Sequence, residues 1–296
     1  LGPILYIIFV SDFPSYMRHY STSLMYADDT VLLTGKRGTE DLEIASYIAL
    51  NLAAEYSSVN DLVLNESKTK QIVLGKNREK ISELPNITAT NEVKHLGVII
   101  DEKLSWEGHV NKLCQKLSSA IFAIKRIKTI STQAASKTVY HALFETHLRY
   151  GIVLWGGSTA KHLQRTLILQ KKAVRAISGL GVRDSCRQAF KDLGILTAPS
   201  VYILETILYV STQHLPRHQD RHAYQTRNAT NFALPSHKTS LYETKPTYAG
   251  AKFLNNLPET LKSISRNLLK KKLTAWLLGK SFYSLEEFLT WRNNQH

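Results

Sequence analysis

The stretch SLMYADDTVLL, residues 23–33, sets two adjacent carboxylates, Asp28 and Asp29, between two apolar runs. Short runs of β-forming residues on either side of a polar centre are typical of a β-hairpin, so we expect the aspartates at its tip. Adjacent ionised groups repel each other, and an isolated buried charge is costly. The pair therefore lies either in a solvated turn, where most such dipeptides are found, or in a site that binds a cation.

The cation site has a clear chemical basis. Carboxylates on a rigid hairpin supply the hard oxygen ligands that Mg²⁺ prefers, and substrate phosphates complete its coordination. Two such ions about 3.5–4 Å apart stabilise both the attacking and the leaving oxygen in phosphoryl transfer. The flanking apolar runs and the basic composition of the chain leave the metal site and the solvated turn about evenly matched.

Helical and extended patterns alternate around the hairpin. Pro3 lies where the first turn of a helix tolerates proline, and Gly97 interrupts an extended run, which often marks close approach of the backbone. The predicted elements are a short buried helix (or a strand) over 2–10, a helix over 40–60, a strand, turn and strand over 61–75 with the turn at 65–67, and a strand over 92–101. This mixture predicts an α+β region over residues 1–105.

After Trp106 the apolar positions recur at helical spacing almost throughout. Helices are predicted over 109–130, 131–155, 159–179, 184–194, 199–213 and 267–291, the last interrupted at Gly279, with a basic loop over 215–246. Aromatic residues at apolar helical positions are expected in the core: Trp155, Tyr202, Tyr209 and Trp276. We therefore divide the chain into regions 1–105, 106–213 and 214–296, the last two mainly helical.

The chain is basic: 38 Lys and Arg oppose 24 Asp and Glu, which gives a net charge of +14 over 296 residues. This balance predicts a polyanionic partner, with nucleic acid first and an anionic membrane surface second, although a merely soluble basic protein has the same composition. A phosphate backbone would fit one helix face that carries Lys112, Lys116, Lys125, Arg126 and Lys128. A solvated amphipathic face explains that pattern too, as it does the clusters at Lys171, Lys172 and Arg175 and at residues 270–272.

Several kinds of site and compartment are disfavoured. The only cysteines, Cys114 and Cys186, form no CxxC pair, which excludes a disulfide framework or a cysteine-rich zinc site and indicates a reducing compartment. No apolar run is long enough to cross a bilayer, and no signal sequence is evident, so we expect an intracellular protein of the nucleus or cytoplasm, not secreted and without a membrane partner.

His214, His218 and His222 recur every four residues, but Pro216 interrupts them and favours a basic loop over a metal site.

Ordered motifs over nearly the whole chain resemble the reverse transcriptases of non-LTR retrotransposons, in particular the jockey-like elements. YADDT at 26–30 looks like their catalytic hairpin, and LGPILYIIFVSDFP at 1–14 looks like an L-G-P motif followed by an apolar helix and D-x-P. The other similar segments are LNESKTKQIVLG at 64–75, VKHLGVIIDEKLSWEGHV at 93–110, LQKKAVRAISG at 169–179, DSCRQAFKDLGILTAPSVYILETILYV at 184–210 and HAYQTRN at 222–228.

The resemblance implies a right-hand polymerase: a partial palm of antiparallel strands and helices over 1–105, an all-α thumb-like region over 106–213, and a C-terminal helical region over 214–296. It implies two Mg²⁺ ions in the intact parent, an RNA template, a DNA primer and deoxynucleotides. It assigns Asp28 and Asp29 as the metal ligands, Tyr26 to the nucleotide or primer end, Lys68 to protonation of departing pyrophosphate, and Leu96 with Gly97 to the turn that grips the primer.

Each of the minor assignments has a structural alternative. Tyr26 equally fits a cross-strand packing residue, Lys68 a solvated turn lysine, and Gly97 an ordinary strand bulge. Family members also carry another metal-binding aspartate and the fingers upstream of L-G-P, whereas Asp12 matches D-x-P. We therefore expect a chain that begins inside the motif and does not extend primers alone. The leading hypothesis is a fragment of an RNA-directed DNA polymerase, and the alternative is a catalytically inactive basic helical relic that binds nucleic acid or protein.

Overall fold

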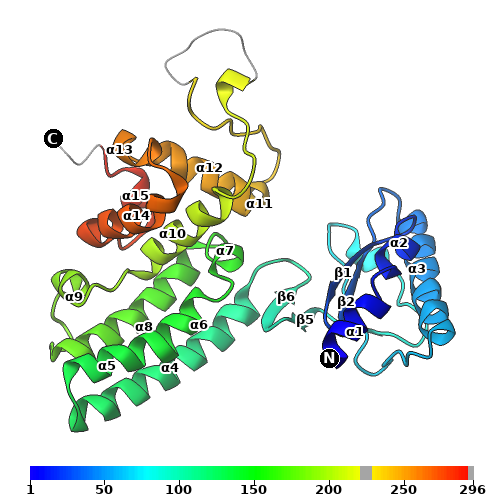
Figure 1. The fold of residues 1–296 in the computed structure, drawn as a ribbon, viewed down its shortest axis with the longest axis horizontal. Helices are drawn as coiled ribbons and strands as arrows, with labels where there is room; N and C mark the ends of the chain where they lie inside the picture. Colours follow the sequence, from blue (N-terminus) through cyan, green and yellow to red (C-terminus); the bar gives the residue numbers. More distant parts are fainter. Residues whose placement is uncertain (221–228, 293–296) are drawn as a thin grey trace. The chain divides into compact units, whose positions relative to one another are not determined.

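The structure is a computed structural model that describes residues 1–220 and 229–292. The chain divides into two compact units, Leu1–Ser105 and Trp106–His296 (Figure 1). The first unit mixes helices with short strand pairs, and the second is helical. An α+β fold is therefore present.

The first unit is built around a small apolar core. Helices α1 (Gly2–Phe9) and α2 (Phe13–Met17) precede the strands β1 (Thr22–Tyr26) and β2 (Asp29–Leu33), and the long helix α3 (Thr39–Val59) follows. Met25 and Leu32 of the strands pack against a cluster from α2 and α3, formed by Phe13, Met17, Ala49, Ala53 and Tyr56. The hairpin and the helices predicted at 2–10 and 40–60 are thus confirmed, but the helix at 2–10, which was predicted to be buried, is exposed.

The rest of the first unit corrects two predictions. The strands β3 (Lys70–Gln71) and β4 (Thr88–Ala89) pair in parallel, and β5 (Glu92–His95) pairs antiparallel with β6 (Val98–Asp101). Residues 61–64 form no strand, because Asp61 has a φ of 53° and the Leu62 amide donates to the Ser57 carbonyl at the end of α3. The strands form three separate two-stranded sheets, and the β3–β4 pair is parallel, whereas the resemblance implied antiparallel strands.

The single strand predicted over 92–101 is a hairpin. Leu96 and Gly97 form its two-residue loop, with φ angles of 45° and 81°. A loop of this length matches the right-handed twist of its strands when both residues have positive φ, and glycine adopts that conformation at little cost. Gly97 therefore serves a turn rather than a bulge within a strand.

Helix α1 exposes an apolar surface. None of its residues is buried, and Ile4 and Ile8 are 62% and 63% exposed. Contiguous exposed apolar side chains mark a contact surface or promote aggregation.

We expect the double substitution Ile4→Lys and Ile8→Lys to raise the solubility of the 296-residue chain at least about twofold, because it removes this patch. The solubility limit in ammonium sulfate measures the effect. Val182→Lys is the matched control, because Val182 is an isolated exposed side chain (89%). An equal gain from Val182→Lys would show that added charge, rather than loss of the patch, is responsible.

The second unit forms one large core. Its principal helices are α4 (Glu107–Ile130), α8 (Ala160–Ser178), α10 (Ala198–Val210), α12 (Pro246–Asn256) and α14 (Arg266–Lys280). Shorter elements connect them: α5 (Gln133–Val139), a π-helical segment η2 (Tyr140–Glu145), α6 (Thr146–Arg149), α7 (Ile152–Trp155), α9 (Arg187–Leu193), η3 (His218–Asp220), α11 (Ser240–Glu243), α13 (Glu259–Lys262) and α15 (Leu285–Leu289). Leu117, Trp155, Tyr202 and Leu277 belong to the same buried cluster, so residues beyond 214 complete the core of those before it.

Four predictions for the second unit differ from the structure. Helix α11 lies within the loop predicted over 215–246. The helix predicted over 131–155 is interrupted, because Gly151 adopts a φ of 63° between α6 and α7. Helix α14 continues through Gly279 and ends before Ser281, whose φ is 50°. Tyr202 is covered by Gly156, Gly157 and Phe253, whereas Tyr209, two turns farther along α10, is 45% exposed and does not belong to the core. Trp155 is fully buried and Trp276 is half-buried.

No single helix in the described ranges has both the length and the apolar character needed to span a bilayer. The helices Arg187–Leu193 and Ala198–Val210 meet that criterion only as a pair, with a bend of 53° between them. Nearly every residue of α10 is buried in the core of the second unit, which accounts for its apolar composition.

Candidate functional site

The paired aspartates lie at the tip of the β1–β2 hairpin. Tyr26 pairs with Asp29 across the two strands, so Ala27 and Asp28 form the two-residue loop. Ala27 has a φ of 53°, a conformation that glycine adopts more readily than any residue with a side chain. The tight loop fixes the two carboxylates at successive positions, one in the turn and one at the first residue of β2.

The two carboxylates face solvent. Both aspartates are exposed, and the side chain of Asp29 shares a strand face with Tyr26, opposite the face on which Met25 and Leu32 pack against α2 and α3. Within the described residues the side chain of neither aspartate makes a hydrogen bond or ion pair, and no three His, Cys, Asp or Glu side chains gather into a metal-binding group. The free lone pairs suit a cation whose remaining ligands are water or phosphate oxygens.

The other residues assigned by resemblance lie on different elements. Lys68 is exposed in a turn that Asn65 closes: the Asn65 Oδ1 accepts the backbone N–H of Lys68 at 3.1 Å and the Ser67 hydroxyl at 2.7 Å. Leu96 and Gly97 form the β5–β6 loop. In the described chain the Lys68 side chain makes no hydrogen bond or ion pair with Asp28 or Asp29, whereas Tyr26 pairs with Asp29 across the hairpin.

Asp12 has a structural partner that the sequence did not reveal. The Tyr56 hydroxyl donates to the Asp12 Oδ1 at 2.5 Å, which ties the start of α2 to α3. Burial, together with this hydrogen bond, raises the pKa of Tyr56 to about 12, so the phenol stays protonated and remains a donor at neutral pH. Asp12 therefore supports the packing of the hairpin's neighbours.

The predicted basic face of α4 is largely exposed. Leu113, Leu117 and Ile124 are buried, while the exposed cations are Lys112, Lys116, Lys125 and Arg126. Lys128 is half-buried, because it lies at the boundary of the apolar face. Phe122 is 67% exposed among the polar residues, a position that the spacing of the basic residues does not predict.

The cluster predicted at Lys171, Lys172 and Arg175 is mostly structural. The Lys171 ammonium lies 3.9 Å from the centre of the Tyr283 ring, and the Arg175 side chain donates to the Asp184 carbonyl at 2.9 and 3.1 Å. Burial lowers the pKa of Lys171. Lys172 is exposed, and so are residues 270–272 of α14, so these cations are available to an anionic partner.

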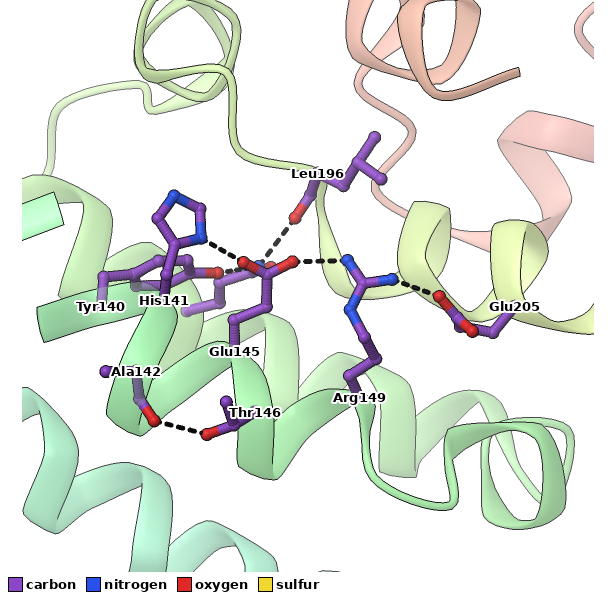
Figure 2. Close-up of polar contacts among 9 residues, drawn as sticks. Tyr140, His141, Ala142, Glu145, Thr146, Arg149, Leu196 and Glu205 are labelled. Atoms are coloured by element: carbon purple, nitrogen blue, oxygen red, sulfur yellow. Dashed lines mark hydrogen bonds and ion pairs between the residues drawn. The ribbon is translucent and has the colours of Figure 1, made fainter. Parts of the chain in front are cut away.

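A chain of polar side chains joins three segments of the second unit (Figure 2). Glu145 bonds His141 and Arg149 along η2 and α6, and Arg149 reaches across to Glu205 on α10. Burial raises the pKa of the Glu145 carboxyl, but the hydrogen bonds from Arg149 and His141 outweigh that effect and hold its pKa below the usual range. The ion pairs fix a π-helical segment, a rare geometry, against the core.

The depressed pKa of Glu145 predicts acid sensitivity. The ionised Glu145 contributes its full stabilisation above the pKa that it has in the unfolded chain, near 4.5. This contribution is lost as the pH falls through the lower pKa that it has in the folded protein. We expect Glu145→Gln to lower the free energy of unfolding by about 1–3 kcal/mol at pH 7 and to have a smaller effect at pH 3. Urea unfolding at both pH values tests this, with the exposed Glu286→Gln as the control. An effect of Glu145→Gln that is equal at both pH values would contradict the assignment.

The histidine triplet is only partly described. His214 is exposed and His218 is half-buried in η3, while His222 lies outside the described residues. The residues between them include Pro216, whose carbonyl accepts the Ala233 amide at 2.9 Å. The segment is held by backbone pairing rather than by a continuous helix.

Comparison with curated proteins gives a consistent result. The chain is 23% identical over 249 residues to a probable RNA-directed DNA polymerase from transposon X-element of Drosophila melanogaster, which covers 79% of this chain and 26% of that protein. It is 26% identical over 197 residues to the RNA-directed DNA polymerase from mobile element jockey of Drosophila funebris, covering 60% of this chain and 21% of that protein. It is 24% identical over 242 residues to a probable RNA-directed DNA polymerase from transposon BS of Drosophila melanogaster. The matched region covers 75% of this chain and 25% of that protein.

These matches confirm the resemblance to the RNA-directed DNA polymerases of jockey-like non-LTR retrotransposons. The chain spans about a quarter of the length of these relatives. No protein-family model matches the sequence, and no solved structure matches the chain.

Proposed function

We propose that this chain supplies part of an RNA-directed DNA polymerase of a non-LTR retrotransposon, in which Asp28 and Asp29 hold two Mg²⁺ ions. The observation that carries the proposal is a pair of adjacent carboxylates, fixed at the tip of a tight hairpin, whose oxygens have no partner among the described residues. The similarity to proteins named as RNA-directed DNA polymerases supports it.

The proposed reaction is attack of a DNA primer 3′-hydroxyl on the α-phosphate of a deoxynucleotide, directed by an RNA template, with pyrophosphate leaving. Magnesium bound at the pair would neutralise the charge that develops on the reacting oxygens. Tyr26, which shares a strand face with Asp29, would border the nucleotide or primer end. Lys68 would donate a proton to the leaving pyrophosphate, and the turn at Leu96 and Gly97 would hold the primer.

Two exposed apolar surfaces of the first unit support the proposal that this chain is part of a larger polymerase. Helix α1 buries none of its residues, and the outer face of the hairpin presents Leu24 and Leu33, about half exposed. Surfaces of this kind are contact sites in soluble proteins. We propose that other parts of the polymerase cover them when the catalytic site is assembled.

The second candidate function is a catalytically inactive basic protein that binds nucleic acid. The exposed cations of α4 favour it, because they need no active site to attract a polyanion. The two candidates differ in what they require of Asp28 and Asp29, since binding through α4 does not involve them.

A chimera tests the proposed function. Residues 1–296 replace the aligned segment of the Drosophila funebris jockey polymerase, and Mg²⁺-dependent incorporation of deoxynucleotides on an RNA template is measured. The proposal predicts incorporation above that of a chimera carrying both Asp28→Asn and Asp29→Asn. A chimera that has the helical content of its parent by circular dichroism but incorporates no nucleotide would contradict the proposal and favour the inactive candidate.

A further inference from the structure

A groove in the second unit lies apart from the aspartate hairpin. Helices α4 and α8 pack against each other, and a groove of about 800 Å³ is lined by residues of both. Its lining includes Asn111, Gln115 and Ser118 of α4 and Arg165, Ile168 and Leu169 of α8. Arg165 donates to the Asn111 Oδ1 at 2.6 Å, which spans the two walls and leaves further guanidinium donors available.

The charged side chains of the groove are cationic and lie on α8, because the α4 residues that line it are uncharged. Helix α8 contains no acidic residue, and α4 contains only Glu107, at its first position. Lys161, Arg165 and Lys172 recur at intervals of four and seven along α8, so they share the helix face that lines the groove. Lys161 and Lys172 are exposed, and neither forms an ion pair within the described residues. A groove with this charge attracts a polyanion.

Apolar side chains interrupt the cations. Ile168 is 46% exposed on the groove, and Phe122 is 67% exposed one turn beyond Ser118 along the same edge of α4. Aromatic rings beside a basic groove accept stacked nucleobases, and this stacking is available from single strands, whose base faces are free. A duplex presents phosphates to the cations but keeps its base faces stacked inside.

We propose that the α4–α8 groove binds single-stranded nucleic acid, with its phosphates on Lys161, Arg165 and Lys172 and a base stacked on Phe122. This inference does not rest on the proposed polymerase reaction, because none of its residues belongs to the hairpin. Failure of the chimera to incorporate nucleotides and failure of this groove to bind a strand are separate outcomes.

Binding is measured with the full 296-residue chain and a fluorescein-labelled 12-nucleotide RNA of mixed sequence. Lys161→Gln with Lys172→Gln is compared with Lys270→Gln and Lys271→Gln, a matched pair of exposed helical lysines outside the groove. We expect the double substitution in the groove, Lys161→Gln with Lys172→Gln, to weaken RNA binding roughly 20-fold at 0.1 M salt. It should also make the slope of the logarithm of the binding constant against the logarithm of salt concentration shallower by about 1.4, because each phosphate contact on a single strand contributes about 0.7. Equal losses from both pairs would overturn the proposal.

Phe122→Ala tests the stacking step, with Leu268→Ala, another half-exposed helical side chain, as its control. We expect Phe122→Ala to weaken RNA binding at least about fivefold and Leu268→Ala to leave it unchanged. An abasic ribose-phosphate strand of the same length should bind the Phe122→Ala variant and the parent chain equally. No loss with the base-bearing RNA, or equal binding of a 12-base-pair duplex, would overturn the assignment to single strands.

Discussion

Replacing Asp29 by Asn in the polymerase chimera is expected to lower RNA-templated nucleotide incorporation by at least about 10³-fold. Removal of one negative charge weakens the hold on both metal ions, and the charge on the reacting oxygens then lacks several kcal/mol of stabilisation. Asp28→Asn should have an effect of similar size, and the double substitution should be little worse, because the two carboxylates act as one site. Steady-state incorporation at saturating primer and template measures the change.

The chain contains a matched control for this prediction. Glu40 and Asp41 are also adjacent and exposed, but they lie in the first turn of α3. Glu40→Gln with Asp41→Asn removes the same charge from the same unit, and we expect incorporation to stay within about twofold of the parent chimera. A loss as large as that from Asp29→Asn would mean that general charge, rather than the hairpin site, supports the reaction.

The largest expected loss of stability comes from Gln170→Leu in α8. Gln170 is fully buried and makes three hydrogen bonds: its Nε2 donates to the Tyr140 hydroxyl at 2.7 Å and to the Leu196 carbonyl at 2.8 Å, and its Oε1 accepts the Ala198 amide at 2.7 Å. These bonds join the π-helical segment and the start of α10 to α8. Leucine fills a similar volume but leaves three buried polar groups without partners, which costs about 3–5 kcal/mol.

Urea unfolding of the full chain, followed by far-ultraviolet circular dichroism, measures this loss. Gln188→Leu is the control, because Gln188 is an exposed residue of α9 whose side chain, within the described residues, bonds only to Asp192 on the same helix. We expect Gln188→Leu to change the free energy of unfolding by less than about 0.5 kcal/mol. A Gln170→Leu variant as stable as the parent would show that the three bonds do not form in solution.

Local patterns predicted the elements that carry the strongest periodicity. The helices at 109–130 and 159–179 and the hairpin around Asp28 follow from apolar spacing alone, and Gly179 ends α8 as expected, with a φ of 70°. The sequence also located the carboxylate pair at the hairpin tip. The assignment of palm, thumb and metal ligands stays a prediction.

The remaining features depend on contacts between distant residues. The bond from Tyr56 to Asp12 joins positions 44 apart, and nothing local to either residue marks it. The burial of Tyr202 but not Tyr209 depends on where the neighbouring helices end. The groove residues Asn111 and Arg165 lie 54 positions apart and meet only because α4 and α8 pack together.

Localisation of Mn²⁺, a substitute for Mg²⁺ that broadens nearby NMR signals, tests the central claim most directly. The claim is that Asp28 and Asp29 together hold a divalent cation at the hairpin tip. In the full chain, Mn²⁺ should selectively weaken the amide signals of residues 26–30, and Asp28→Asn with Asp29→Asn should abolish that loss, whereas Glu40→Gln with Asp41→Asn should not. Signal loss around Glu40 and Asp41 that equals or exceeds the loss at the tip would contradict the claim.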